Sequence, residues 1–144
     1  MTIPSELKKN EIYPARITGY TSEGAGVCRI GERAVFVPGT IVGKEWDVRI
    51  VRSTSAAVWG RGETLRSPSP HRAKPDCPAY PRCGGCALRH MDYEEELSLK
   101  LQRVNDALHR IGKLDFSVSG ILPAPEDARQ RRKVIFNVAE QNGR

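Results

Sequence analysis

Three of the four cysteines lie close together in the middle of the sequence, where they could bind a metal. Cys77, Cys83 and Cys86 fall within ten positions, with the spacing C-x5-C-x2-C. Thiolates that converge in this way usually hold zinc or an iron–sulfur cluster. Gly84 and Gly85 can adopt positive φ, so the backbone can wrap closely around a bound ion. The spacing therefore predicts a metal centre on one short loop.

A disulfide with one thiol left over is the alternative interpretation. No apolar secretion segment precedes the cysteines, so we expect a cytoplasmic protein, and in that reducing compartment clustered cysteines more often bind metal. The sequence leaves the identity of the fourth ligand undecided. His90 would complete a Cys3His zinc site; otherwise the fourth ligand lies outside this chain. Cys28 belongs to an expected strand of another domain, and we do not expect it to be a ligand.

The composition favours a small, basic, turn-rich protein. A chain of 144 residues normally forms one domain, or one small domain with a satellite. Ten prolines and thirteen glycines indicate many turns. The net charge of +6 favours a polyanionic partner, above all nucleic acid, although an ordinary basic protein is the alternative. No run approaches the roughly 18–20 apolar residues of a membrane span, so we expect no membrane contact.

The elements that must position this loop begin with a set of short strands. Strand patterns occupy residues 12–20, 27–30, 34–37, 46–51 and, less distinctly, 56–65. Short strands with a turn signal every roughly 8–12 residues are typical of a barrel or sandwich. We therefore expect a mainly β fold with α, in which residues 1–66 form a small five-stranded OB-like barrel. About 60 residues make a marginal core, so the barrel is expected to lean on the later part of the chain.

Small five-stranded barrels often bind nucleic acid through a basic face with aromatic rings on which bases stack. The candidate cations in this part of the chain are Arg16, Arg29, Arg33, Lys44 and Arg49. They alternate with the aromatic residues Tyr13, Tyr20, Phe36, Trp46 and Trp59. We expect Phe36 and Trp46 to belong to the core. For each cation, a merely solvated side chain is the alternative.

Residues 67–92 are predicted to be a linker and the cysteine loop. Three prolines with His71, Arg72 and Lys74 indicate an extended basic linker before the cysteines. An amphipathic helix then begins at the N-cap Asp92 and ends at Gly112. Its apolar stripe comprises Leu97, Leu101, Val104, Leu108 and Ile111. We expect this stripe to pack on the cysteine loop and the barrel, with a partner helix as the alternative.

Residues 93–144 are predicted to be this helix and the beginning of an α+β domain. Strand patterns occupy residues 116–122 and 134–138. A basic run precedes the second strand and comprises Arg129, Arg131, Arg132 and Lys133. Such a run suits contact with phosphates, with a charged strand edge as the alternative. Asn142-Gly143 is typical of a hairpin turn, and its return strand is missing, so we expect a truncated domain.

These segments together resemble the N-terminal part of the RNA uracil-5-methyltransferases, which make 5-methyluridine in transfer and ribosomal RNA. Residues 24–27 and 34–39 are similar to the TRAM domain, an RNA-binding barrel. Residues 77–90 resemble the [4Fe-4S] motif of the family, which is highly specific. Residues 131–136 resemble the basic segment that enters its central RNA-facing region. The resemblance covers nearly the whole chain.

The resemblance implies a [4Fe-4S] cluster on Cys77, Cys83 and Cys86, with a fourth cysteine further along than this chain runs. It also implies S-adenosylmethionine in the full-length enzyme, where a thiolate adds to uracil C6, C5 attacks the methyl group and a base removes the C5 proton. We find no strand–Gly-rich turn–helix unit for that cofactor in these residues.

We therefore expect a monomeric RNA-recognition and iron–sulfur portion that contacts a ribosomal or transfer RNA loop and does not methylate alone. The alternative function is a free-standing, zinc-stabilised RNA-binding module.

Overall fold

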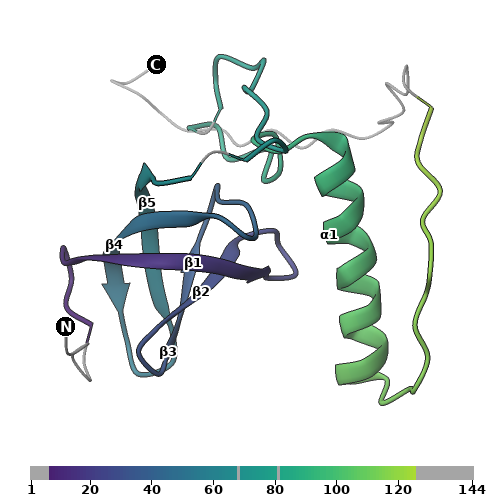
Figure 1. Cartoon of the computed structure of the whole chain (residues 1–144), viewed down its shortest axis with the longest axis horizontal. Coiled ribbons are helices and arrows are strands. Elements are labelled where there is room, and N and C mark those ends of the chain that lie inside the picture. Colours follow the sequence, from purple (N-terminus) through teal and green to yellow (C-terminus); the bar gives the residue numbers. More distant parts are fainter. Residues whose placement is uncertain (1–6, 68, 81, 126–144) are drawn as a thin grey trace, which may run out of the picture.

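A computed structural model of the chain describes residues 7–67, 69–80 and 82–125. Five strands form a closed barrel: β1 (Ile12–Tyr20), β2 (Gly26–Ile30), β3 (Arg33–Val37), β4 (Glu45–Ser53) and β5 (Val58–Leu65). Helix α1 (Tyr93–Asp106) continues into a π-helical turn, η1 (Ala107–Ile111). In Figure 1 the barrel lies beside α1, and the segment with the cysteines lies above both. The predicted mainly β fold with one helix is confirmed.

The barrel closes in the order β1-β2-β3-β5-β4, and only the β3–β5 pair is parallel. One level of the barrel is set by the register of Ile17 with Cys28, Cys28 with Val35, and Val35 with Val58. All four side chains are 0% exposed. Side chains alternate across a strand, so this register turns every second residue into one shared core.

Trp46 and Phe36 were both expected in the core, but only one of them lies there. Trp46 is 6% exposed and belongs to the core, as predicted. The prediction for Phe36 is wrong, because this ring is only partly buried and lies against Trp59, with ring centroids 5.2 Å apart. Its neighbours Val35 and Val37 are both fully buried, so the alternation of the strand turns Phe36 outward.

Two glycines are required by the tight interior of the barrel. A Cβ on Gly26 would lie 2.1 Å from the Thr40 Oγ1 atom. A Cβ on Gly60 would lie 2.4 Å from the Val48 Cγ1 atom. Both distances are far below van der Waals contact, so a larger residue at either position would force strands apart.

Helix α1 begins as predicted, with half of a capping box. The Asp92 Oδ1 atom accepts a hydrogen bond from the Glu95 backbone N–H at 2.9 Å. The Glu95 carboxylate does not return to the cap; it accepts a hydrogen bond from the Tyr20 hydroxyl of β1 instead. The same hydroxyl accepts from the Val42 N–H at 3.0 Å. Glu95 therefore attaches the first turn of the helix to the barrel.

The face of α1 that meets the barrel differs from the predicted one. Leu99 is 4% exposed and packs with Ile41 and Met91 in a second small cluster. In the predicted stripe, Val104 is 47% exposed and Ile111 is 83% exposed. Leu99 lies two positions from Leu97, which is about 200° around a helix. None of the five stripe residues belongs to the barrel core or to the cluster around Leu99, so the prediction that the stripe packs on the barrel is wrong.

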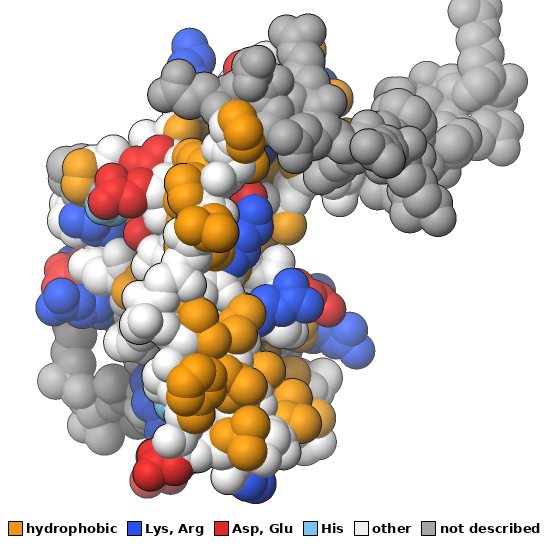
Figure 2. Space-filling model, turned by 90° about the vertical axis from the view of Figure 1, so that its right-hand side faces the viewer, with side chains coloured by type: hydrophobic (Ala, Val, Ile, Leu, Met, Phe, Trp, Pro, Cys, Tyr) orange, Lys and Arg blue, Asp and Glu red, His pale blue; other side chains and the backbone are white. Residues whose placement is uncertain are grey.

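Residues 113–125 run extended beside α1, and the strand predicted over 116–122 does not form in this described segment. The backbone N–H and C=O of Val118 bond the Asn105 side chain of the helix, at 2.7 and 3.1 Å. Figure 2 shows hydrophobic side chains gathered on the outer face of this part of the molecule. Ile111, Phe116 and Leu122 are 83%, 61% and 95% exposed.

Several predictions fall on residues outside the described ranges. These are the strand over residues 134–138, the turn at Asn142-Gly143 and the basic run of Arg129, Arg131, Arg132 and Lys133. Within residues 7–125, apart from positions 68 and 81, no helix has the length and apolar character that crossing a membrane requires.

Candidate nucleic-acid interface and cysteine loop

The cysteine loop is closed at its base by a short backbone pairing. Arg72 and Met91 form an isolated antiparallel bridge. The Ala73 N–H donates to the His90 carbonyl at 3.0 Å, and the Asp92 N–H donates to the His71 carbonyl at 2.8 Å. The predicted linker therefore returns to the start of α1, and the three clustered cysteines all lie in the loop between.

His90 fastens this loop to the barrel. Its side chain is 2% exposed, with Nε2 3.3 Å from the Thr40 carbonyl and Nδ1 3.0 Å from the Tyr80 hydroxyl. A carbonyl only accepts, so we assign the proton to Nε2, which leaves Nδ1 to accept from Tyr80. Burial lowers the pKa of His90 and favours this neutral form. Both ring nitrogens are thus engaged, which gives the zinc alternative no support.

The three thiols of the loop are suitable metal ligands, although their sulfur atoms do not converge on one point. Cys77 is half-buried, Cys83 and Cys86 are exposed, and none of the chain's cysteines is in a disulfide. Among the described residues, no three His, Cys, Asp or Glu side chains form a metal-binding group. Gly84 has a φ of 70°, and a Cβ on Gly85 would lie 3.4 Å from the Cys83 Sγ atom. The loop thus bends tightly around one sulfur, as a thiolate-held centre needs.

Cys28 is separate from this loop. Its side chain is 0% exposed inside the barrel, and its thiol lies 3.7 Å from the Val35 carbonyl, to which it donates. Burial raises the pKa of Cys28 to about 11. It is a core thiol, in keeping with the expectation that it is not a ligand.

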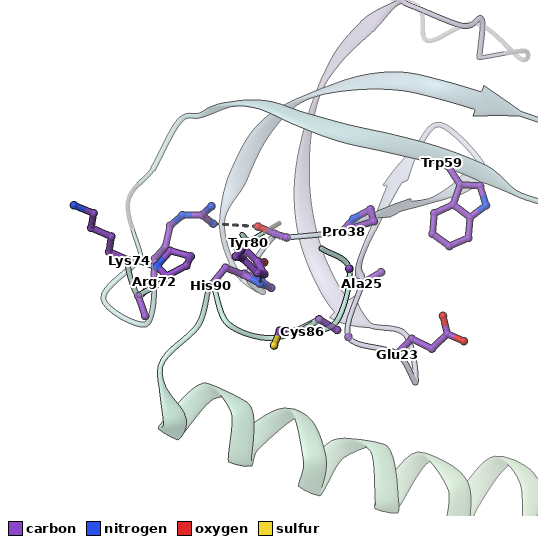
Figure 3. A pocket seen from close by; sticks show the side chains of 15 residues that line it. Glu23, Ala25, Pro38, Trp59, Arg72, Lys74, Tyr80, Cys86 and His90 are labelled. Atoms are coloured by element: carbon purple, nitrogen blue, oxygen red, sulfur yellow. Dashed lines mark hydrogen bonds between the residues drawn. The ribbon is translucent and has the colours of Figure 1, made fainter. Parts of the chain in front are cut away.

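A cleft of about 880 Å³ separates the barrel from the cysteine loop. Its barrel side is formed by the β1–β2 turn, by Pro38 after β3 and by Trp59 of β5. Its other side is formed by the linker and the loop. Figure 3 shows Arg72 and Lys74 at one end and Trp59 and Glu23 at the other, with His90 and Cys86 between. The cleft thus combines cations with an aromatic ring, which are the groups that bind single-stranded nucleic acid.

The basic residues of the cleft are not those predicted from the barrel sequence. Arg16, Arg29, Arg33 and Lys44, all within the described residues, do not line the cleft. Arg16 and Arg29 are exposed on neighbouring strands, and the antiparallel register places them at the same end of the Ile17–Cys28 pair. The Arg33 guanidinium donates to the Thr54 and Ser55 carbonyls and so holds the β4–β5 turn.

The cleft takes its cations from the linker. Arg72 donates to the Gly39 carbonyl at 3.1 Å, and its guanidinium carbon lies 5.1 Å from the centre of the Trp46 ring. Lys74 is exposed. The basic, proline-rich composition of the linker was the available signal, because such a segment reaches across a surface in extended form. Its position over the barrel depends on the His90 contact, which the sequence pattern does not reveal.

Comparison with known proteins defines the class of the barrel first. Residues 6–61 match the family model of the TRAM domain. This match covers all but the last residues of β5, so the closed barrel is a TRAM domain.

Relatives extend the match beyond the barrel. An uncharacterized RNA methyltransferase of Clostridium tetani is 37% identical over 138 residues, which cover 96% of this chain and 30% of the relative. A similarly named protein of Listeria monocytogenes is 33% identical over 140 residues, or 97% of this chain and 31% of the relative. The chain thus spans about a third of their length. Over nearly its whole length the chain is thus similar to a part of these RNA methyltransferases.

A solved structure agrees in fold. The crystal structure of Pyrococcus abyssi tRNA (uracil-54, C5)-methyltransferase in complex with S-adenosyl-L-homocysteine matches with a TM-score of 0.54 and 27% identity. The match covers 78% of this chain and 24% of that protein. The similarity therefore includes residues beyond the TRAM domain.

Proposed function

We propose that this chain is the RNA-recognition and iron–sulfur portion of an S-adenosylmethionine-dependent RNA uracil-5-methyltransferase. The observation that carries the proposal is a closed TRAM barrel that turns Phe36 and Trp59 outward beside a basic linker. Rings of this kind accept unstacked bases, and cations nearby neutralise phosphates. The likeness to RNA methyltransferases over nearly the whole chain supports the same function.

The finer parts of this proposal rest on the likeness to the Pyrococcus abyssi enzyme. That protein is a tRNA (uracil-54, C5)-methyltransferase in complex with S-adenosyl-L-homocysteine. We infer a transfer or ribosomal RNA loop as the substrate, a cytoplasmic location and a monomeric state. Methyl transfer itself belongs to parts of the enzyme outside these residues, and the role of this chain is to bind and orient the RNA.

Cys77, Cys83 and Cys86 are proposed to hold a [4Fe-4S] cluster together with a fourth thiolate from outside this chain. Three thiols in one loop, closed by the Arg72–Met91 bridge, support this assignment. A bound cluster would supply a cross-link and no chemistry for methyl transfer. The chain's own contribution is His90, which ties the loop to Thr40 of the barrel and would align the cluster with it.

RNA binding is tested by a filter-binding series in rising salt with single-stranded RNA. The affinity is expected to fall linearly on a logarithmic scale, with a slope near −0.7 for each neutralised phosphate. A flat response would contradict phosphate contact.

Replacing Arg131, Arg132 and Lys133 together by alanine is expected to weaken binding, because this removes three cations that could contact phosphates. Unchanged binding would favour the alternative interpretation of this run as a charged strand edge.

The cluster is tested by anaerobic purification of this chain and of a version extended beyond Arg144. Iron, acid-labile sulfide and brown absorbance are expected, and Cys83→Ser should remove them. Cys28→Ser is the matched control, because this thiol lies inside the barrel, and its iron content should be unchanged. Absence of iron and sulfide from both versions would contradict the cluster. One zinc per chain, lost on His90→Ala, would support the zinc-stabilised module instead.

A further inference from the structure

We propose that the cleft between the barrel and the cysteine loop holds one unstacked nucleotide of single-stranded RNA, with its base against Trp59 and its phosphate at Arg72 and Lys74. This inference rests on the proposed function for its partner and adds the site and the orientation. The volume of about 880 Å³ falls within the roughly 300–1,000 Å³ typical of ligand sites.

The base-binding end is formed by a ring that is already held in place. Trp59 pairs in register with Phe36 across β3 and β5, and the two rings are tilted by 50° with centroids 5.2 Å apart. The Trp59 side chain is only partly buried, so part of its surface is open to the cleft. A ring fixed by a neighbour loses little freedom when a base stacks on it, which favours binding.

The phosphate-binding end is formed by two cations of the linker. The Gly39 carbonyl and the Trp46 ring restrain Arg72, which keeps its guanidinium at the rim of the cleft. Lys74 lies beside it and is exposed. In Figure 3 both residues lie at the end of the cleft opposite to Trp59, with the Arg72 guanidinium directed at the Gly39 carbonyl and the Lys74 ammonium pointing outward. Two cations at one end position a phosphate without reading sequence.

Glu23 fixes the orientation of the nucleotide. Its carboxylate lies at the Trp59 end of the cleft. A carboxylate repels a phosphate at close range, whereas it accepts hydrogen bonds from base amino groups. The charges at the two ends therefore favour the backbone at Arg72 and Lys74 and the base at Trp59.

The test measures binding of a single-stranded RNA hexanucleotide to the 144-residue chain by fluorescence anisotropy and by quenching of tryptophan emission. Wild type is expected to bind with quenching, because Trp59 is partly exposed while Trp46 is buried. Trp59→Ala should weaken binding roughly 5- to 150-fold, the range expected for one stacked base. Trp59→Phe should retain most of the affinity and lose the quenching. Lys74→Ala should lower the magnitude of the salt slope by about 0.7.

Two matched controls lie outside the cleft. Phe116→Ala removes a ring that is 61% exposed, and Lys100→Ala removes a cation that pairs with Glu96 on α1. Both should bind as wild type does. Wild-type affinity in a Trp59→Ala variant with an unchanged melting curve would overturn the cleft site while RNA binding stands. If that variant does not fold, Lys74→Ala decides by the same comparison. If the wild-type chain binds no RNA, the proposed function fails first.

Discussion

The barrel and the cysteine loop are held together by different means. In the barrel every strand pairs with two neighbours, and Ile17, Val35 and Val58 at its centre are 0% exposed. In the loop Cys83 through Ala87 are all exposed. The loop is fixed mainly at its base and through His90. The barrel is therefore specified by the packing of its own buried residues. The loop has few buried residues, and its position depends on a small number of contacts with the rest of the chain.

The largest expected effect on stability comes from a substitution in the barrel core. Ile17→Ala removes three carbons from a side chain that is 0% exposed, so it should lower the free energy of unfolding by about 2–5 kcal/mol. Urea denaturation followed by tryptophan fluorescence measures the change. Ile111→Ala is the matched control, because this residue is 83% exposed, and its effect should stay within about 0.5 kcal/mol. Equal losses in the two variants would contradict the assignment of the core.

The second effect separates the loop from the barrel. His90→Ala leaves the Thr40 carbonyl and the Tyr80 hydroxyl without their buried partner, which should cost about 1–3 kcal/mol. The barrel core is untouched, so the strands should remain folded while trypsin cuts faster at Arg82 and Arg89. Mass spectrometry of the fragments locates the cuts. His109→Ala is the control, because this histidine is exposed, and unchanged cleavage in His90→Ala would refute the anchoring role.

A smaller effect is expected where the loop passes into the helix. Asp92→Ala removes the N-cap of α1 and should cost about 0.5–2 kcal/mol. Thermal melting followed by circular dichroism measures the loss. Asp92→Asn keeps a side-chain acceptor for the Glu95 N–H and should stay close to wild type. A loss as large in Asp92→Asn would indicate that the charge, and not the cap, stabilises this junction.

The smallest effect is a pH dependence at the same junction. A hydrogen bond to Asp92 at 3.0 Å raises the pKa of His71 above its ordinary value of 6.5. The contribution of His71 to stability should therefore be complete below about pH 6.5 and be lost as the pH rises through the raised pKa. Melting temperatures of wild type and His71→Gln at pH 5.5 and 8.5 measure this. Their difference should shrink at the higher pH; a constant difference would exclude the ion pair.

The barrel was the more predictable region because its information is local. Alternation with a period of two predicts all five strands, and the same rule read at Val35 and Val37 would have placed Phe36 outside. Asp92 was recognisable as a cap because its bond to the Glu95 N–H spans only three residues. Each of these features depends on residues that are near one another in sequence.

The remaining features depend on tertiary contacts. Helix α1 packs on the barrel through the single residue Leu99, not through the longer stripe, because Leu99 contacts Ile41 and Met91. Val118 bonds the Asn105 side chain, so its backbone needs no neighbouring strand. The position of Lys74 in the cleft depends on the fold of the linker over the barrel. Patterns of hydrophobicity carry none of this information.

Closure of the barrel limits how this domain can meet its partners. Since β1 pairs with β4 as well as β2, every strand of the described barrel has a hydrogen-bonded neighbour on both sides along part of its length. Along these doubly paired stretches an extended peptide cannot join the sheet by β-augmentation, and copies of the domain cannot associate edge to edge there. Recognition falls to outward side chains and connecting loops, which can change during evolution while the hydrogen-bonded ring beneath them stays intact.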